Sequence, residues 1–266
     1  MVRDMKQIKA KITQNKKVAE GFFKMRVESA YLAKNIKPGQ FIEALVSGAL
    51  DPLLRRPLGA HRILKKEIEV LYEVVGKGTA ILSGKRTGEY LDVIGPLGNG
   101  FEIKDTNGKQ AILIAGGIGV APIVALAEEL LRRKAKVHAI IGAKKRSHIM
   151  CDSELKSMGC SVSVATEDGS KGRKGFVTDL LRDILSTINY QPSTIYACGP
   201  NGMLEAIWRI AKDKGIPCQF SFESRMACGV GVCLGCPIKV RDGLIDFEYK
   251  MVCKDGPVFN AEEVFW

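Results

Sequence analysis

The stretch from Glu223 to Pro237 reads ESRMACGVGVCLGCP and places three cysteines close together. Cys228, Cys233 and Cys236 follow the spacing C-x4-C-x2-C, and Cys253 lies further along the chain. Four thiolates spaced in this way are typical of a plant-type [2Fe–2S] centre, whose two irons need soft, deprotonated sulfur ligands. The interleaved glycines let the loop turn tightly and bring backbone N–H groups close to the inorganic sulfides. The stretch therefore predicts an iron–sulfur site with these four cysteines as ligands.

A structural zinc site is the main alternative, because it also uses four cysteines. Such sites usually contain two C-x2-C pairs, whereas this stretch has one pair and a solitary fourth cysteine. We therefore favour iron–sulfur over zinc, and both over unligated thiols. A disulfide framework is disfavoured because no signal peptide opens the sequence, so we expect a reducing, cytoplasmic compartment. Small core residues are the expected role for most of the other cysteines, Cys151, Cys160, Cys198 and Cys218.

Length and charge narrow the class of protein further. The chain has 266 residues, a net charge of +11 and a pI of about 9.3, so we expect two domains with a small third. A basic surface suits nucleic acid, membranes or anionic small molecules. No nucleic-acid motif accompanies the charge, and no apolar run is long enough to span a bilayer. We expect neither nucleic acid nor membrane as a partner, and favour a solvated basic face or phosphate-bearing cofactors.

Residues 1–103 read as a β-rich domain. Short alternating runs separated by Gly, Pro and Asn are typical of an antiparallel barrel. The expected strands are Lys6–Thr13, Phe22–Val27, Phe41–Val46, Arg62–Lys65 and Ile68–Val75. The glycine-rich stretch Ile94–Phe101 is interpreted as the exit loop of this barrel, and Lys104–Gln110 as a polar linker.

Two segments of this domain contain groups that commonly bind phosphate. Arg55 and Arg56 precede Pro57, and guanidinium groups offer a planar fork of donors that suits a pyrophosphate. Gly76–Thr79 lies between an expected strand and an apolar helix start, where free N–H groups and the helix dipole can hold a phosphate. An exposed arginine pair and a plain strand-to-helix turn are the alternatives.

Residues 104–222 change to a pattern of strands alternating with helices, which predicts a doubly wound parallel sheet. The expected strands are Ala111–Ala115, Lys136–Ile141, Ser161–Thr166, Thr194–Cys198 and Gln219–Phe222. The expected helices are Ile123–Arg133, Asp152–Met158, Thr178–Ser186 and Asn201–Lys214. Ligands of such sheets bind beyond the carboxyl ends of the strands, where the Gly116–Gly119 and Cys198–Pro200 turns fall.

The Gly116–Gly119 turn has the pattern GGxG, which is only part of a dinucleotide-binding fingerprint. A tight turn without a ligand is the alternative. Instead of the acidic ribose ligand expected about 20 residues on, the next strand is followed by Lys144, Lys145 and Arg146. These residues suit a 2′-phosphate, which would favour NADP, but solvent-exposed side chains fit equally well, and the spacing leaves the choice open.

The three histidines, His61, His138 and His148, have no nearby carboxylate or cysteine partner in the sequence. We expect solvated or structural histidines, with His61 close enough to Arg56 to line a cofactor pocket. Residues 223–266 form the third segment. Strands at Ile238–Val240 and Ile245–Tyr249 flank an Asp-Gly turn, and the resulting hairpin is expected to bring Cys253 back to the other three cysteines.

Taken together, the motifs resemble the ferredoxin–NADP reductase superfamily. Within it, the chain is most similar to the electron-transfer subunits of two-subunit, NAD-dependent dihydroorotate dehydrogenases of the class 1B type. The resemblance covers nearly the whole chain. It rests on PGQF (38–41), RRP (55–57), GKGT (76–79), GPLGNGF (95–101), AGGIGVAP (115–122), EDGSKGRKGFVTDLL (167–181), ACGP (197–200), the cysteine stretch and CKDGPVF (253–259).

The resemblance implies a cofactor for each segment. FAD is expected on the barrel, [2Fe–2S] on Cys228, Cys233, Cys236 and Cys253, and NAD over the two glycine turns. The implied FAD contacts are Arg56, Pro57, Leu58, Gly59, Leu71, Tyr72 and Glu73, with Gly78 and Thr79 at the pyrophosphate. The implied NAD contacts are Gly116, Gly117, Gly119, Cys198, Gly199 and Pro200. The family usually has serine where this chain has Gly59, so we expect a shifted flavin potential.

The resemblance also implies a reaction. Because a cluster carries single electrons and nicotinamide accepts a hydride, a flavin is expected between them. Electrons from dihydroorotate, oxidised at the FMN of a separate catalytic subunit, would pass through the cluster to FAD and leave as hydride to NAD+. This step belongs to de novo pyrimidine (UMP) biosynthesis, and a heterotetramer with two copies of each chain is expected. The alternatives are a ferredoxin:NADP oxidoreductase or hydrogenase gamma subunit, and a zinc-binding regulatory module.

Overall fold

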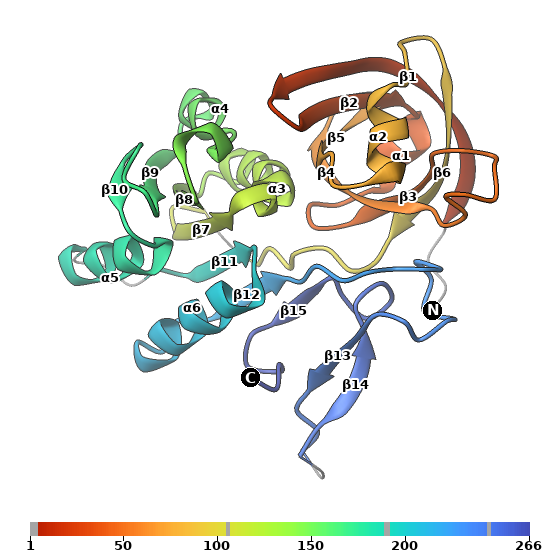
Figure 1. Cartoon of the computed structure of the whole chain (residues 1–266). Helices are drawn as coiled ribbons and strands as arrows, with labels where there is room; N and C mark the ends of the chain where they lie inside the picture. The colour runs from red at the N-terminus through yellow and green to blue at the C-terminus, as the bar shows by residue number, and fades with distance from the viewer. Residues whose placement is uncertain (1–4, 105–106, 189–191, 244–245) are drawn as a thin grey trace.

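The computed structural model describes residues 5–104, 107–188, 192–243 and 246–266 (Figure 1). The first part of the chain forms a closed antiparallel barrel with the strand order β1-β2-β5-β4-β3-β6, which confirms the predicted architecture. Its elements are β1 (Lys6–Ala19), β2 (Phe22–Glu28), α1 (Ala30–Asn35), β3 (Phe41–Leu45), β4 (Arg56–Ile63), β5 (Glu67–Glu73), α2 (Lys77–Ser83) and β6 (Tyr90–Leu97).

The barrel core is formed by the side chains that alternate toward the inside along each strand. In β2, for example, Met25 and Val27 are buried in the barrel and the residue between them is not, because successive side chains of a strand point to opposite faces. Residues from neighbouring strands, such as Ile12 and Ile68, complete this core and are fully buried.

Three details of the barrel differ from the sequence-based expectation. The stretch expected as an exit loop from Ile94 is part of β6 up to Leu97, which pairs with β1 and β3. The strand expected at Arg62–Lys65 begins instead at Arg56 and ends at Ile63, because the RRPLG motif itself pairs with β3. Helix α1 had not been expected, although the side chain of Ser29 caps it by accepting a hydrogen bond from the Leu32 N–H.

The second part of the chain forms a seven-stranded sheet with the order β10-β9-β8-β7-β11-β12-β15. Its strands are β7 (Gln110–Gly116), β8 (Lys136–Ala143), β9 (Ser161–Thr166), β10 (Arg173–Lys174), β11 (Thr194–Cys198), β12 (Cys218–Ser221) and β15 (Val258–Asn260). The helices are α3 (Val120–Arg132), α4 (Asp152–Met158), α5 (Val177–Thr187) and α6 (Asn201–Asp213), with one-turn 3-10 helices at Gly117–Gly119 and Arg146–His148.

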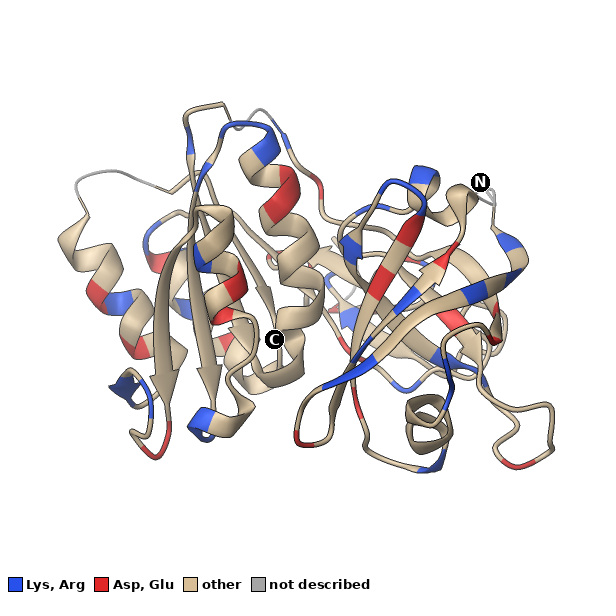
Figure 2. Cartoon of the chain, turned by 90° about the horizontal axis from the view of Figure 1, so that it is seen from above, with Lys and Arg blue, Asp and Glu red and all other residues tan. Residues whose placement is uncertain are grey.

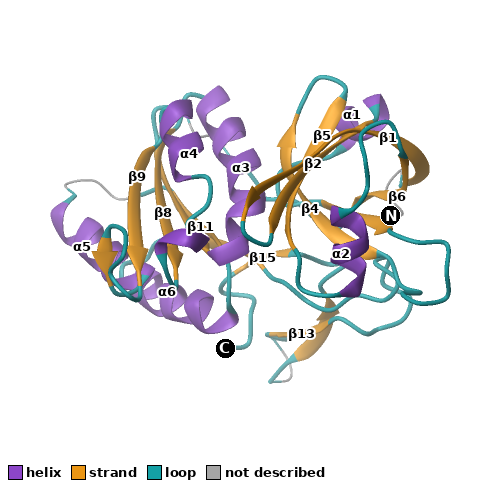
Figure 3. Ribbon diagram, turned by 45° about the horizontal axis from the view of Figure 1, so that its top comes forward, coloured by secondary structure: helices purple, strands orange, loops and turns teal. Residues whose placement is uncertain are grey.

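Both faces of this sheet are covered. Leu113 and Ala115 of β7 pack with α3, whereas Ile112 and Ile114 pack in the core that contains α5 and α6. Figure 3 shows α3 on the side of the sheet that faces the barrel. The strands are parallel up to β12. Strands β8 to β10 extend the sheet on one side of β7, whereas β11 and β12 extend it on the other side, so the strand order reverses between β7 and β11. Such a switch point creates a ligand-binding crevice beyond the strand ends.

The cysteine segment lies against this sheet. A small hairpin of β13 (Pro237–Val240) and β14 (Glu248–Met251) follows the cysteine loop. The chain then returns as β15, which pairs antiparallel with β12 and was not expected from the sequence. Ile245, where the second strand of the hairpin was expected to begin, lies outside the described residues, as do residues 105–106 of the expected linker.

Basic and acidic residues are spread over both halves of the molecule (Figure 2). In the part of the chain that the structure describes, no helix has the length and apolar character needed to cross a bilayer.

Candidate functional site

The four cysteines of the predicted cluster come together at the end of the hairpin. Cys236 and Cys253 are each only 2% exposed, whereas Cys228 is half-buried and Cys233 is exposed. Backbone N–H groups already point at the sulfurs. Gly231 N–H lies 3.1 Å from Cys253 Sγ, and the Cys253 N–H lies 3.4 Å from Cys236 Sγ. A four-sulfur set surrounded by amide donors is the environment that an iron–sulfur cluster requires.

The thiols differ in their tendency to ionise. Burial would raise the pKa of Cys228, but hydrogen bonds from the backbone N–H groups of Cys233 and Val230 outweigh it and lower the pKa to about 6. Burial, followed by the neighbouring Cys236, raises the pKa of Cys253 to about 12. At neutral pH, Cys228 is therefore mostly a thiolate, whereas Cys253 stays protonated until a bound cation displaces its proton.

A buried carboxylate lies behind the cysteine loop. Glu43 of β3 is 1% exposed, and among the described residues neither of its carboxylate oxygens has a hydrogen-bond partner. Its side chain packs against Gly229, where a Cβ would lie 2.5 Å from Glu43 Cγ. Gly229 also has φ of +69°, so glycine is required there for two separate reasons. Sequence reasoning missed this contact because Glu43 looks like an ordinary outward residue of a strand.

The pKa of Glu43 leads to a prediction about stability. Burial raises this pKa from 4.5 to about 7, Arg55 opposes the rise and Cys228 adds to it. The pKa of Glu43 is higher in the folded than in the unfolded protein, so the protonated side chain contributes to the free energy of unfolding. This contribution is fully present below pH 4.5 and is lost as the pH rises through 7. We expect Glu43→Gln to flatten this profile and to be more stable than wild type above pH 7 by up to about 3 kcal/mol.

Denaturant unfolding of both proteins between pH 5 and about 8 measures this difference. The exposed Glu28 offers a matched control, since Glu28→Gln should follow the wild-type profile. Equal slopes for wild type and Glu43→Gln would contradict the assignment.

A cavity of about 440 Å³ opens on the barrel side of the crevice. Most of the residues expected to contact FAD line it: Pro57, Leu58, Gly59, Leu71, Tyr72, Glu73 and Thr79. Residues that had not been singled out also line it, notably Phe41, Pro122 and Met226. None of the three had been expected as an FAD contact, although each lies in a stretch quoted above: PGQF, AGGIGVAP and the cysteine stretch.

Arg56 and Gly78, the remaining expected FAD contacts, touch each other beside this cavity. A Cβ at Gly78 would lie 2.2 Å from Arg56 Nε, so glycine leaves the room that the guanidinium occupies. Thr79 Oγ1 accepts hydrogen bonds from the N–H groups of Val75 and Gly76 at 3.0 and 3.3 Å. The Arg55–Pro57 and Gly76–Thr79 segments thus lie together beside the cavity. Binding of a pyrophosphate by these two segments stays a prediction.

Gly59 allows a direct test of the flavin environment. A Cβ at this position meets no heavy atom within 4 Å, so Gly59→Ser should fold without strain. One added hydrogen bond of about 0.5–1.5 kcal/mol corresponds to a shift of roughly 10–30 mV in a two-electron midpoint potential. Potentiometric titration of both proteins measures the shift, and matching potentials would reject the hypothesis that Gly59 sets the flavin potential here.

A larger cavity of about 880 Å³ lies at the carboxyl ends of the parallel strands. Of the expected NAD contacts, Gly116, Gly117, Gly199 and Pro200 line it. Cys198 lines the smaller cavity instead, and Gly119 lines neither. A Cβ at Gly119 would lie 2.3 Å from the Cys198 carbonyl oxygen, so this glycine lets the two turns pack together.

The two cavities adjoin. Glu73, Ile118 and Glu223 line both of them. Burial, and then the charge of Glu73, raises the pKa of Glu223. A flavin in the smaller cavity and a nicotinamide in the larger one would therefore meet beside a pair of carboxyl groups. The two are called the flavin cavity and the nicotinamide cavity below, after the ligands expected in them. Sequence reasoning had named Glu73 but missed Glu223, which opens the cysteine stretch.

The larger cavity contains charges of both signs. Of the three basic residues after β8, Lys144 lines the cavity and Lys145 and Arg146 do not, while Glu167 lines it from the end of β9. Phe176 is 61% exposed at its rim. An anionic cofactor therefore meets one lysine and one carboxylate in this region.

The histidines occupy three different environments. His148 lines the larger cavity, and His138 Nε2 lies 2.9 Å from the Ser163 hydroxyl. His61 is fully buried and is not among the residues that line the flavin cavity, which corrects the expectation for it. Its imidazole instead faces α3 and α4, as described below.

These features together define a class. A barrel with a flavin-sized cavity, an adjoining nicotinamide cavity on a parallel sheet and a four-cysteine loop form an iron–sulfur flavoprotein reductase of the ferredoxin reductase type. Two family models match the chain. The iron–sulfur cluster binding domain of dihydroorotate dehydrogenase B matches residues 223–265, and the oxidoreductase NAD-binding domain matches residues 113–209.

Curated relatives agree along nearly the full length. The chain is 38% identical over 263 residues to the dihydroorotate dehydrogenase B (NAD(+)) electron transfer subunit of Geobacillus sp. strain WCH70, covering 98% of this chain and 99% of that protein. The corresponding subunit of Caldanaerobacter subterraneus subsp. tengcongensis is 37% identical, with the same coverage. The chain belongs to the family of dihydroorotate dehydrogenase B electron transfer subunits.

Solved structures agree with this fold. A chain of an NADH-dependent reduced ferredoxin-NADP oxidoreductase, studied for flavin-based electron bifurcation, aligns with a TM-score of 0.84 and 29% identity over 97% of this chain and 90% of its own length. A ferredoxin NADP+ reductase from Neisseria gonorrhoeae with bound FAD and NADP aligns with a TM-score of 0.66 and 17% identity over 79% of this chain and 92% of its own length, which shows the fold alone.

Proposed function

We propose that the chain is the electron transfer subunit of a dihydroorotate dehydrogenase and carries electrons to NAD+ in de novo pyrimidine biosynthesis. One observation supports this proposal: the sites expected for the cluster, the flavin and the nicotinamide lie next to one another. The segment that leads into the cysteine loop, through Glu223 and Met226, lines the flavin cavity. Glu223 also lines the nicotinamide cavity, so the cysteine loop, the flavin cavity and the nicotinamide cavity adjoin in that order.

The bound groups supply the redox chemistry, because a cluster passes single electrons, a nicotinamide takes a hydride and a flavin can do both. The residues of this chain hold these groups in place. Arg56 and Gly78 provide the corner for a pyrophosphate, and the turns at Gly117 and Gly199 line the nicotinamide cavity. Apolar side chains such as Leu71 and Phe41 exclude water from the flavin cavity.

The partner is proposed to be an FMN-containing catalytic subunit, in a heterotetramer with two copies of each chain. Cys233 is exposed, and the residues on either side of it, Val232 and Leu234, are 79% and 66% exposed. Apolar side chains exposed beside an electron-transfer site support docking of another protein there. The cytoplasm is the proposed compartment, and it suits a chain with eight free cysteines.

A second candidate is a subunit of an NADH-dependent reduced ferredoxin-NADP oxidoreductase. The solved chain of that class has 29% identity to this chain and a TM-score of 0.84. Lys144 in the nicotinamide cavity also suits the additional phosphate of NADP. The lower identity relative to the dihydroorotate dehydrogenase subunits, which reach 38%, places this candidate second.

Reconstitution distinguishes the two candidates. The chain is purified together with an FMN-containing dihydroorotate dehydrogenase subunit, given dihydroorotate and NAD+, and monitored for NADH formation. The proposal predicts NADH formation that requires both chains. Failure to couple to dihydroorotate, combined with NADPH-dependent reduction of ferredoxin, would reject it in favour of the second candidate.

A further inference from the structure

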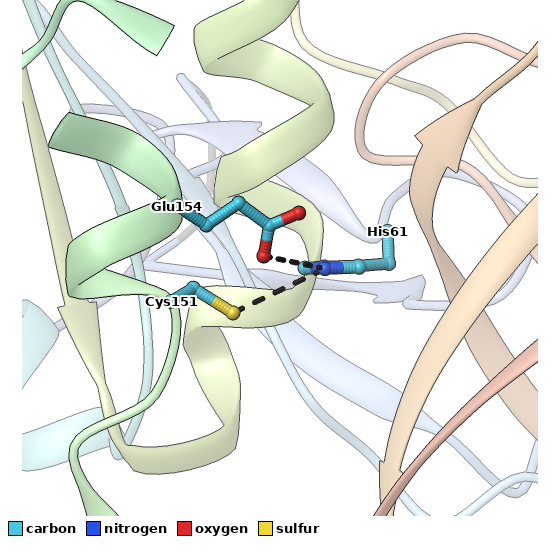
Figure 4. Close-up of side chains that lie close together, drawn as sticks. All are labelled: His61, Cys151 and Glu154. Atoms are coloured by element: carbon cyan, nitrogen blue, oxygen red, sulfur yellow. Dashed lines mark hydrogen bonds and ion pairs between the residues drawn. The ribbon is translucent and has the colours of Figure 1, made fainter. Parts of the chain in front are cut away.

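Three side chains of types that commonly bind metals meet between the barrel and the parallel sheet (Figure 4). His61 comes from β4 of the barrel, and Cys151 and Glu154 come from the start of α4. His61 Nε2 lies 4.0 Å from Cys151 Sγ and 3.7 Å from Glu154 Oε2. The three ligand atoms all lie within 4.8 Å of one another. None of these residues lines the flavin or the nicotinamide cavity.

The histidine ring is oriented as a ligand. His61 Nδ1 lies 2.9 Å from the Ala121 carbonyl oxygen, so Nδ1 carries the proton and donates it to that oxygen. In the neutral ring, the lone pair of Nε2 then faces the sulfur and the carboxylate. Metal-binding histidines almost always donate their other N–H group to a carbonyl or carboxylate in this way. Nε2 can therefore accept a hydrogen bond from the Cys151 thiol or act as a metal ligand.

The two residues from α4 are placed by the backbone. Cys151 precedes the helix with φ of +61°, a left-handed conformation that is uncommon outside glycine. Its side chain forms no capping hydrogen bond. Glu154 follows three residues later, and residues at this spacing lie on the same side of a helix. The unusual conformation at Cys151 thus turns its sulfur toward the same point as the Glu154 carboxylate.

Basic residues pair with the carboxylates around this group, and Arg62 Nη1 lies 3.6 Å from Glu154 Oε1. Lys24 Nζ lies 2.5 Å from Glu154 Oε2, and Arg26 binds Glu69, whose Oε1 is 3.8 Å from His61 Nε2. A carboxylate oxygen that binds a metal commonly accepts a hydrogen bond as well. Lys24 can therefore hold the Glu154 carboxylate in place while that carboxylate binds a cation.

We propose that His61 Nε2, Cys151 Sγ and the Glu154 carboxylate bind a zinc ion that joins the barrel to the sheet. Nitrogen, sulfur and oxygen donors together suit zinc, with bonds of about 2.0–2.3 Å and tetrahedral ligand separations of roughly 3.3–3.8 Å. The separations from His61 need to close by only a few tenths of an ångström to bind it. The Cys151 thiol gives its proton to solvent as the metal binds, and water fills the fourth position.

Cobalt titration of the holoprotein tests this proposal. The chain is kept anaerobic with its iron–sulfur cluster intact, so that the four cluster cysteines are occupied, and is then titrated with Co²⁺ and with Zn²⁺ as competitor. We expect one Co²⁺ per chain, a sulfur-to-cobalt absorption band and displacement by Zn²⁺. Cys151→Ser should abolish the band and weaken binding at least about 10- to 100-fold, and Glu154→Gln should weaken binding while the band remains.

Cys160→Ser is the matched control, because Cys160 is a buried cysteine that follows the same helix and lies outside the group. It should bind Co²⁺ as wild type does. No cobalt uptake by the cluster-loaded wild type, or an identical band in Cys151→Ser, would overturn the proposal and leave an ion-paired contact only. The readout does not involve NADH or dihydroorotate, so its outcome is independent of the proposed function.

Discussion

Replacing Cys236 by serine is expected to abolish electron transfer from the catalytic subunit while flavin reduction by NADH continues. Cys236 is 2% exposed, and its sulfur accepts a hydrogen bond from the Cys253 N–H. Serine cannot replace a soft thiolate ligand, so the cluster should be lost or fail to assemble. NADH formation from dihydroorotate should fall by at least about 100-fold, which exceeds the effect of removing groups that only support a ligand.

Two measurements separate this effect from misfolding. Flavin bleaching by NADH should persist in Cys236→Ser, because Cys236 lines neither cavity. Cys218→Ser changes another buried cysteine of the same core and should retain both activities. A variant that lacks cluster absorption but still couples dihydroorotate to NAD+ would contradict the electron path.

Replacing Gly119 by alanine is expected to weaken nicotinamide binding by forcing apart the two turns that line the larger cavity. The new Cβ would lie 2.3 Å from the Cys198 carbonyl oxygen and 2.9 Å from the Gly199 nitrogen. Both are backbone atoms, so the two turns at the sheet's switch point must separate. Overpacking of this kind typically costs about 1–3 kcal/mol of stability, and the cavity formed by the turns should bind NADH more weakly.

Gly202→Ala provides the stability control. Gly202 lies in α6, where a Cβ meets no atom within 4 Å, so this variant should unfold at or above the wild-type denaturant concentration. Calorimetric titration with NADH measures binding by Gly119→Ala. Wild-type affinity and stability in Gly119→Ala would show that the turns are free to move apart.

Local sequence signals predicted the fold well. The change from alternating to helical periodicity near residue 104 separated the barrel from the sheet, and both were confirmed. The family resemblance, and no local pattern, indicated Leu71, Tyr72 and Glu73 for the flavin; all three line the smaller cavity, and their contact with FAD stays a prediction. Local signals succeed because strand alternation and glycine turns are written into neighbouring residues.

Contacts between distant segments could not be predicted in this way. Glu43 meets Gly229 only after the cysteine loop has packed on the barrel, and His61 meets Cys151 only after the barrel and the sheet have packed together. Strand β15 is three residues long and is held by its pairing with β12. The expectation that His61 lines the flavin pocket was wrong because the pairing of β4 with β5 shifts register between Ala60 and Arg62, which sequence proximity to Arg56 does not reveal.

The most direct test of the central claim is an anaerobic absorption spectrum of the purified chain, recorded before and after addition of NADH. The account predicts flavin bands over a broad red-brown iron–sulfur absorption, with both bleaching when NADH is added. A colourless protein that takes up neither FAD nor iron and sulfide on reconstitution would contradict the account.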